Sequence, residues 1–234
     1  MASRSFFVTG TDTGVGKTLV ASALLLAAGQ RGYRTAGIKP LAAGAEYRRG
    51  SSDRQLFNAD ALALRAVSTM KLDYGLVNPY VFQPPIAPHI AAAQAGVVLS
   101  VRDFTRHFER LAECNLDVMV VEGAGGWFVP INASETLADV CLALRMPVVV
   151  VVGLQLGCLN HALLTVDAIK HAGLEWAGWV ANSVAPGMTV REENLAYLRG
   201  RLPDPCLGVL PFSAGGLRPD AAVRILDFDP LLQA

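Results

Sequence analysis

The sequence predicts an α/β fold in which a mostly parallel β-sheet is flanked by helices on both faces. Two observations lead to this prediction. Short runs rich in β-branched residues alternate with segments of helical periodicity along most of the 234 residues, as expected for consecutive strand–helix units. Several runs, such as residues 148–152, are apolar at every position, which is typical of strands buried on both faces of a parallel sheet.

The elements follow one another in a regular order. Strands are expected at residues 5–9, 35–39, 118–122, 148–152, 176–181 and 206–210. Helices are expected at residues 17–30, 58–67, 101–113, 137–145, 160–171 and 190–201. The polar, glycine-rich segment 44–53 and the segment 73–88, which carries four prolines, are expected to be long functional loops. The residues after Pro211 show no clear pattern, and residues 1–234 are expected to form a single domain.

Charge and composition exclude several kinds of protein. The 20 Lys and Arg residues balance 20 Asp and Glu, so the chain is not expected to hold nucleic acid or an anionic membrane by bulk charge. With 52% hydrophobic and 17% charged residues, it is not a disordered chain. The N-terminus lacks the features of a signal peptide, and no apolar run is long enough to cross a bilayer. We expect a soluble, cytoplasmic protein with four reduced cysteines, Cys114, Cys141, Cys158 and Cys206.

The strongest motif lies between the first predicted strand and the first predicted helix, where the chain reads Gly10-Thr-Asp-Thr-Gly-Val-Gly-Lys-Thr18. A glycine-rich turn in this position predicts a phosphate-binding loop, because its backbone N–H groups and the helix N-terminus attract anionic oxygens. Lys17 is expected to reach the terminal phosphates, and the Thr18 hydroxyl to bind Mg²⁺. Five residues separate Gly10 from Gly16, so the spacing departs from the simple pattern, and an ordinary glycine-rich turn is the alternative.

A second motif ends the strand predicted at residues 118–122. Glu122 is followed by Gly123-Ala124-Gly125-Gly126. A carboxylate at the carboxyl end of a strand, on the same sheet edge as the phosphate loop, is placed to bind Mg²⁺, and the glycines allow a ligand to approach the backbone. A strand-end glutamate before a flexible loop is the alternative.

Three further positions have both a functional and an ordinary interpretation. Lys39 ends the second strand and could neutralise charge during phosphoryl transfer, or it could be a surface lysine. Asp60 could bind a metal, but an acidic residue in the first turn of a helix capped by Asn58 is common. Residues 156–161 could form a second anion site at a helix N-terminus, or Asn160 could simply cap that helix.

The motifs together resemble those of the dethiobiotin synthetases, which are ATP-dependent carboxylases of biotin synthesis. The matches run in order over roughly residues 4 to 183, with one more at 207–211. They are the phosphate loop, Ala36-Gly-x-Lys-Pro40, Asp60-Ala-Leu-Ala-Leu64, Val77-Asn-Pro-Tyr80, Pro88-His-Ile90, Val121-Glu-Gly-Ala-Gly-Gly-Trp127, Leu156-Gly-Cys-x-Asn-His161, Ala177-Gly-Trp-Val-Ala-Asn182 and Leu207-Gly-x-Leu-Pro211.

The resemblance implies a P-loop NTPase-like homodimer that uses ATP, Mg²⁺ and CO2 to close a ureido ring on 7,8-diaminopelargonic acid. One amine forms a carbamate, ATP phosphorylates the carbamate, and the second amine displaces phosphate to give dethiobiotin. The substrate supplies both nucleophiles, so the protein is expected mainly to position groups and neutralise charge. No nucleic acid or membrane partner is implied.

Carried over position by position, the resemblance also implies roles for individual residues. Thr18, Asp60 and Glu122 would bind Mg²⁺, while Lys17, Lys39 and Thr13 would be the catalytic residues. The nucleotide would lie against Gly14, Val15, Gly16, Lys17, Thr18, Glu122, Gly123, Ala124, Gly125, Asn182 and Pro211. The diamine would contact Thr13, Lys39, Gly157, Cys158, Leu159 and Asn160.

The chain departs from the family pattern at three places. Gly14 replaces a glutamate that is often present in the loop, and Ala43 stands where a serine can contact the substrate. The lost contact at Ala43 is worth about 1 kcal/mol. The tyrosine that the family can send across the dimer interface aligns with Asn194, and Tyr197 lies one turn further on.

Three other functions stay open from the sequence. One is an amide or cyclo-ligase of the cobyrinate diamide synthase type, which would need a separate glutaminase. Another is a partner-regulated ATPase of the MinD/ParA type, although the loop lacks the additional lysine that such a switch would carry at Thr11–Thr13. An inactive nucleotide-binding relative is the third, and the presence of Lys17, Thr18, Asp60 and Glu122 argues against it.

Overall fold

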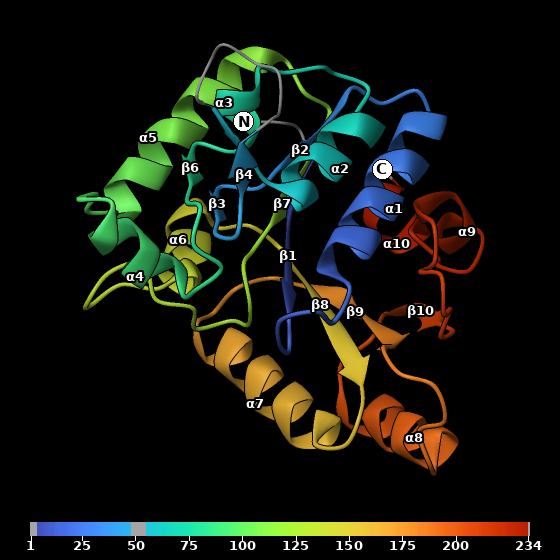
Figure 1. Ribbon diagram of the computed structural model, residues 1–234. Helices are drawn as coiled ribbons and strands as arrows, with labels where there is room; N and C mark the ends of the chain where they lie inside the picture. Colours follow the sequence, from blue (N-terminus) through green and yellow to red (C-terminus); the bar gives the residue numbers. More distant parts are fainter. Residues whose placement is uncertain (1–3, 48–54, 234) are drawn as a thin grey trace.

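The computed structural model describes residues 4–47 and 55–233 (Figure 1). Its centre is a six-stranded sheet in the order β10-β9-β8-β1-β7-β2, and every neighbouring pair is parallel. The strands are β1 (Arg4–Gly10), β2 (Thr35–Ile38), β7 (Val118–Glu122), β8 (Val148–Leu154), β9 (Trp176–Ser183) and β10 (Cys206–Leu210). All six predicted strands are therefore confirmed, and β8 and β9 each run two residues further than expected.

Helices cover both faces of this sheet. The longer ones are α1 (Lys17–Gln30), α2 (Ala59–Val67), α5 (Val101–Leu111), α6 (Leu137–Leu144), α7 (Cys158–His171) and α8 (Arg191–Arg201). The shorter ones are α3 (Tyr74–Val77), α4 (Pro88–Gln94), η1 (Ala112–Cys114), α9 (Pro219–Val223) and α10 (Asp229–Leu232). Figure 1 shows α1, α9 and α10 together on one side, and α5, α6 and α7 on the other.

Alternate strand residues enter two separate hydrophobic clusters, because successive side chains of a strand point to opposite faces. In β8, Val148, Val150 and Val152 belong to the cluster that also contains residues of α4 to α8, whereas Val149 and Val151 belong to the cluster that contains residues of α1 and the C-terminal helices. All five valines are fully buried. This burial on both faces is the physical reason that the run contains no polar residue.

Two expectations about loops need correction. Segment 73–88 is not a continuous loop, since it contains α3 and the short strand β6 (Tyr80–Val81), which pairs with β3 (Leu41–Ala42). In segment 44–53, β4 (Glu46–Tyr47) pairs with β5 (Leu56–Phe57), and residues 48–53 lie outside the described part. Two-residue strands are too short to show a hydrophobic period, so their pairing depends on tertiary contacts.

The C-terminal segment completes the face on which α1 lies. Phe228 and Leu232 are buried in the same cluster as α1, and the guanidinium group of Arg4 donates to the backbone oxygen of Leu232. Helices of four or five residues carry too little periodicity to be predicted, which explains why this segment shows no pattern. All four cysteines are free, as expected. No helix in the described residues is long and apolar enough to span a membrane.

Candidate active site

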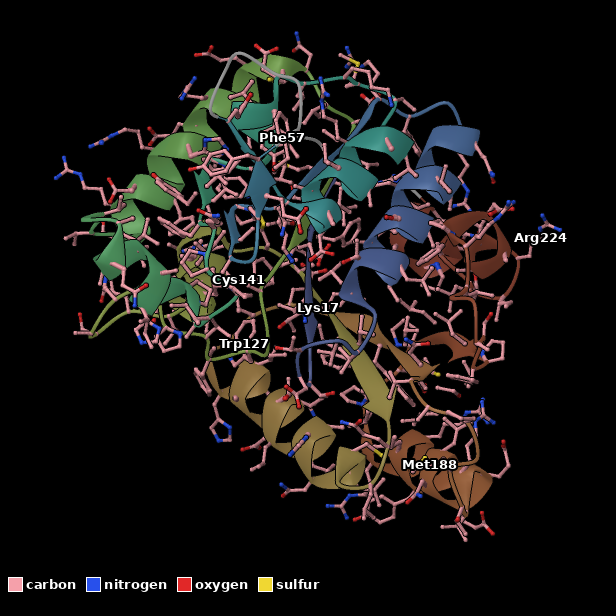
Figure 2. All side chains as sticks on the ribbon, in the orientation of Figure 1. Lys17, Phe57, Trp127, Cys141, Met188 and Arg224 are labelled. Atoms are coloured by element: carbon pink, nitrogen blue, oxygen red, sulfur yellow. The ribbon has the colours of Figure 1, made fainter. Side chains whose placement is uncertain are left out.

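The carboxyl ends of β1, β2 and β7 meet at one edge of the sheet, because these three strands are neighbours and parallel. Figure 2 labels Lys17 there, at the N-terminal end of α1. A cavity of about 710 Å³ opens at this edge. Its lining includes ten of the residues predicted from the sequence, namely Thr13, Gly14, Gly16, Lys17, Thr18, Lys39, Asp60, Glu122, Ala124 and Gly125. Residues from four distant parts of the chain thus form a single site.

The phosphate loop has the backbone conformation that its glycines allow. Gly14 and Gly16 have φ values of 74° and 97°, in the left-handed region that favours glycine. A Cβ atom on Gly16 would also lie 2.3 Å from Nδ2 of Asn182. This amide donates a hydrogen bond of 2.8 Å to the backbone oxygen of Val15. Asn182, at the end of β9, therefore stabilises the loop conformation through this hydrogen bond.

Lys17 is buried inside this loop, with 6% of its surface exposed. Its Nζ donates to the backbone oxygen of Asp12 at 2.9 Å. Burial, helped by the nearby charge of Lys39, lowers the pKa of Lys17 to about 8, although Glu122, Asp60 and Asp12 partly oppose the shift. A bound polyanion would favour the ammonium form, because an opposite charge within a few ångströms stabilises it.

Lys39 is at the centre of a group of charged side chains. Its Nζ lies 2.6 Å from Oε1 of Glu122 and 3.3 Å from Oδ2 of Asp60, and it donates to the backbone oxygen of Gly123 at 2.9 Å. Only 4% of Lys39 is exposed, so the surface-lysine interpretation is wrong. Asp60 is half exposed but paired, so it is more than a solvated first-turn acid.

The oxygen atoms of this group suit a hard divalent cation. The Thr18 hydroxyl donates to Oε1 of Glu122 at 2.9 Å, while Oε2 of Glu122 is buried with no hydrogen-bond partner among the described residues. Such an orphaned carboxylate oxygen is costly unless it gains a ligand. The described residues contain no group of three or more Asp, Glu, His or Cys side chains that could hold a metal ion without other ligands. Two carboxylates and a hydroxyl suit Mg²⁺, which keeps several waters and phosphate oxygens as ligands.

Other predicted residues lie elsewhere. Gly157, Cys158, Leu159 and Asn160 form the start of α7, and none of them lines the cavity in the described part of the chain. Gly157 is the N-cap of this helix, with φ 92°, so the proposed cap by Asn160 is wrong. Val15, Gly123, Asn182 and Pro211 are also absent from the cavity lining in the described residues. Asn182 and Gly123 nevertheless touch the site, through the loop and through Lys39.

One wall of the cavity is apolar and consists of Ala42, Ala43, Pro85, Ile86, Ala87, Pro88, Val129 and Pro130. None of these residues except Ala43 was assigned a site role from the sequence, although four of them lie in segment 73–88, which was expected to be functional. The density of prolines in segment 73–88 was the available signal, because such loops often carry function. An apolar wall in the same cavity as the charged group makes the site suitable for a ligand with both an anionic and an aliphatic part.

The parallel sheet, the left-handed glycines and the buried Lys17 at a helix N-terminus together define a P-loop nucleotide-binding protein. A family model described as an AAA domain matches residues 4–215. Among solved structures, the MinC:MinD cell division protein complex of Aquifex aeolicus has a TM-score of 0.53 at 14% identity, and the match covers 96% of this chain and 87% of that one. At such low identity the likeness concerns the fold alone.

Sequence relatives are much closer. Over 234 residues the chain is 52% identical to the ATP-dependent dethiobiotin synthetase BioD of Cellvibrio japonicus, and the match covers 100% of both. It is 47% identical over 229 residues to the protein of the same name in Aeromonas hydrophila, covering 98% of this chain and 99% of that one. The chain belongs to the ATP-dependent dethiobiotin synthetase family.

Proposed function

We propose that this protein uses ATP to join CO2 to 7,8-diaminopelargonic acid and closes the ureido ring of dethiobiotin, acting in the cytoplasm as a single-domain enzyme without nucleic acid or membrane partners. As a member of this family it is a ligase of biotin biosynthesis. In the proposed course, one substrate amine adds to CO2 and gives a carbamate. The carbamate oxygen attacks the γ-phosphorus of ATP and ADP leaves. The second amine then attacks the carbonyl carbon and phosphate leaves.

The observation that carries this proposal is the pair of buried lysines beside two carboxylates in one cavity. Lys17 lies in the phosphate loop and Lys39 lies between Glu122 and Asp60. Neither cysteine nor histidine lines the cavity in the described residues. A reaction in which both nucleophiles are amines of the substrate requires no nucleophile from a side chain.

The charged groups have separate roles in this course. The backbone of the phosphate loop and Lys17 would hold the β- and γ-phosphates, while Lys39 would neutralise the carbamate and the developing phosphate charge. Thr18, Asp60 and Glu122 would hold Mg²⁺, which supplies positive charge to the phosphate oxygens. Thr13, which is in the cavity lining, would contact the diamine. The apolar wall around Ile86 and Val129 suits the aliphatic chain of the substrate.

The start of α7 in one copy of the chain would bind the substrate that lies in the active site of a second copy. Its residues 157–160 are outside the cavity of their own chain, and large apolar side chains nearby are exposed. Leu156 is 98% exposed, Leu164 62% and Phe128 63%. Phe128 and Leu164 also line a shallow apolar cavity of about 600 Å³ against α7. Exposed apolar patches of this kind mark interfaces, so we propose a homodimer that buries this face.

Leu164→Asp tests the dimer. A carboxylate in an apolar interface should leave a folded monomer, because Leu164 does not pack in the core of its own chain. If α7 of the partner binds the substrate carboxylate, the KM for the diamine should rise about tenfold or more, as expected for the loss of a charge-assisted contact. Light scattering measures the oligomeric state, and steady-state kinetics measure the KM for the diamine. Leu142→Asp on α6 is the matched control. A wild type that is monomeric would refute the proposal.

Product analysis tests the reaction itself. The protein is incubated with 7,8-diaminopelargonic acid, ATP, Mg²⁺ and ¹³C-bicarbonate, and the product is identified by mass spectrometry. The expected product is a cyclic urea that carries the label, formed together with ADP and phosphate in equal amounts. ATP hydrolysis that ignores the diamine would contradict the proposal and favour a partner-regulated ATPase. Turnover only with glutamine and a separate glutaminase would favour an amide ligase.

A further inference from the structure

The segment that contains Val77-Asn-Pro-Tyr80 carries buried polar side chains for which the reaction has no direct use. Tyr74 and Asn78 are 7% and 2% exposed, and neither lines the active-site cavity. Polar groups are buried at a cost unless they form hydrogen bonds. Their partners therefore indicate what the segment does.

Two side chains, those of Tyr74 and Asn78, link the backbones of Asn58 and Lys39 through a continuous series of hydrogen bonds. The backbone N–H of Asn58 donates to the hydroxyl of Tyr74 at 2.7 Å, and this hydroxyl donates to Oδ1 of Asn78 at 2.9 Å. Nδ2 of Asn78 in turn donates to the backbone oxygen of Lys39 at 2.6 Å. We call this series the Tyr74 relay. It joins the residue before α2 to the residue after β2.

At one end, the relay fixes the backbone of Lys39. The Lys39 N–H donates to the oxygen of Val77 at 2.8 Å, and its own oxygen accepts from Asn78. Both backbone groups of Lys39 are thus held by two consecutive residues of one segment. Because β2 ends at Ile38, these two bonds take the place of the sheet ladder at the position that carries the active-site ammonium group.

At the other end, the relay fixes the start of α2. Asn58 is the N-cap of this helix, and its Oδ1 accepts from the N–H of Ala61 at 3.2 Å. Asp60 is the second residue of the same helix. The bond from Asn58 N–H to Tyr74 therefore holds the first turn of α2, and with it the Asp60 carboxylate that lies 3.3 Å from Nζ of Lys39.

We infer that Tyr74 and Asn78 are positioning residues that set the distance between Lys39 and Asp60, and thereby the affinity of the site for a divalent cation. The inference rests on the proposed role of Asp60 as a cation ligand. Groups that orient metal ligands from behind commonly change metal affinity 10- to 100-fold when removed. Burial raises the pKa of Tyr74, which keeps its hydroxyl protonated and able to donate to Asn78.

Tyr74→Phe removes the hydroxyl and keeps the ring, which packs on Phe57 with 4.6 Å between centroids. The expected result is an about tenfold weaker affinity for Mn²⁺ in the complex with ADP, measured by electron paramagnetic resonance. The concentration of Mg²⁺ needed for half-maximal turnover should rise by a similar factor. Tyr80→Phe is the matched control, because Tyr80 belongs to the same segment and packs on Phe104. It should keep the wild-type Mn²⁺ affinity.

The measurement is made at a temperature where circular dichroism shows each variant to be folded. Asn78→Ser interrupts the relay at the Lys39 end and should give the same loss of Mn²⁺ affinity, so the inference does not depend on one variant. A Tyr74→Phe protein with lowered thermal stability but wild-type Mn²⁺ affinity would overturn it, since a merely structural role moves only the stability.

Asp60→Asn separates this inference from the proposed function. If the relay acts through Asp60, the double variant Tyr74→Phe/Asp60→Asn should bind Mn²⁺ as weakly as Asp60→Asn alone, whereas additive losses would overturn the relay. Wild-type Mn²⁺ affinity in Asp60→Asn would overturn the metal role of Asp60 and the inference with it. Binding of Mn²⁺ and ADP requires no diamine. The binding result can therefore be interpreted even if the protein does not close the ring.

Discussion

Replacing Lys39 by methionine should lower kcat for diamine-dependent ADP release by roughly 10²- to 10³-fold, the loss typical when one preorganised charge-stabilising group is removed. The methionine side chain has a similar length but no charge. It leaves the carbamate and the transferred phosphate without the ammonium that lies between Glu122 and Asp60. The KM for ATP should change little, because Lys17 and the loop backbone remain.

The same substitution should also affect stability in a diagnostic way. Glu122 is 1% exposed, and removing the partner of a buried charge costs about 3–5 kcal/mol. Thermal unfolding should therefore shift to lower temperature, and Mg²⁺ with ADP should restore part of the loss by supplying another cation. Lys170→Met, on the exposed side of α7, is the matched control. A Lys39→Met enzyme with near-normal kcat would exclude the proposed mechanism.

Replacing Lys17 by alanine should reduce kcat/KM for ATP on the order of 10³-fold, because the group that contacts the terminal phosphates in both ground and transition state is lost. Unlike Lys39→Met, this variant should bind ATP measurably more weakly, which calorimetry can establish. Its fold should persist, since Lys17 forms its hydrogen bond with a backbone oxygen of its own loop. Unchanged ATP affinity would contradict the assignment of the loop.

The lowered pKa of Lys17 gives the wild type a pH dependence of known sign. The pKa is about 8 instead of 10.5, so above pH 8 the free protein loses the ammonium form that binds phosphate. ATP affinity should fall as the pH rises through this value, and binding above it should take up a proton. Calorimetry in buffers of different ionisation enthalpy measures this uptake, which should vanish in Lys17→Ala.

Much of the fold was predictable because its signals are local. The valines of β8 are apolar on both faces, and the glycines, Lys17 and Thr18 form one contiguous motif. The short pairing of β3 with β6 depends on contacts between residues about forty positions apart. No local pattern encodes such contacts, so this region was taken for a loop.

The same difference between local and long-range signals applies to the candidate site. Glu122, Lys39 and Asp60 each had an ordinary interpretation from the sequence, and the structure brings Lys39 within 2.6 Å of Glu122 and 3.3 Å of Asp60. Tyr74 was not singled out, because a tyrosine between two motifs has no distinctive pattern. Its role depends on partners from α2 and from the end of β2, and sequence spacing alone does not reveal partners of that kind.

The C-terminal helices packed on α1 have a consequence for synthesis on the ribosome, where the chain emerges at about 5–20 residues per second. β1 lies between β7 and β8 in the sheet, so it cannot pair until those later strands have left the exit tunnel. The outer face of α1 remains uncovered still longer, until Phe228 and Leu232 have been synthesised. During translation the apolar α1 is therefore an exposed segment of the kind that chaperones recognise.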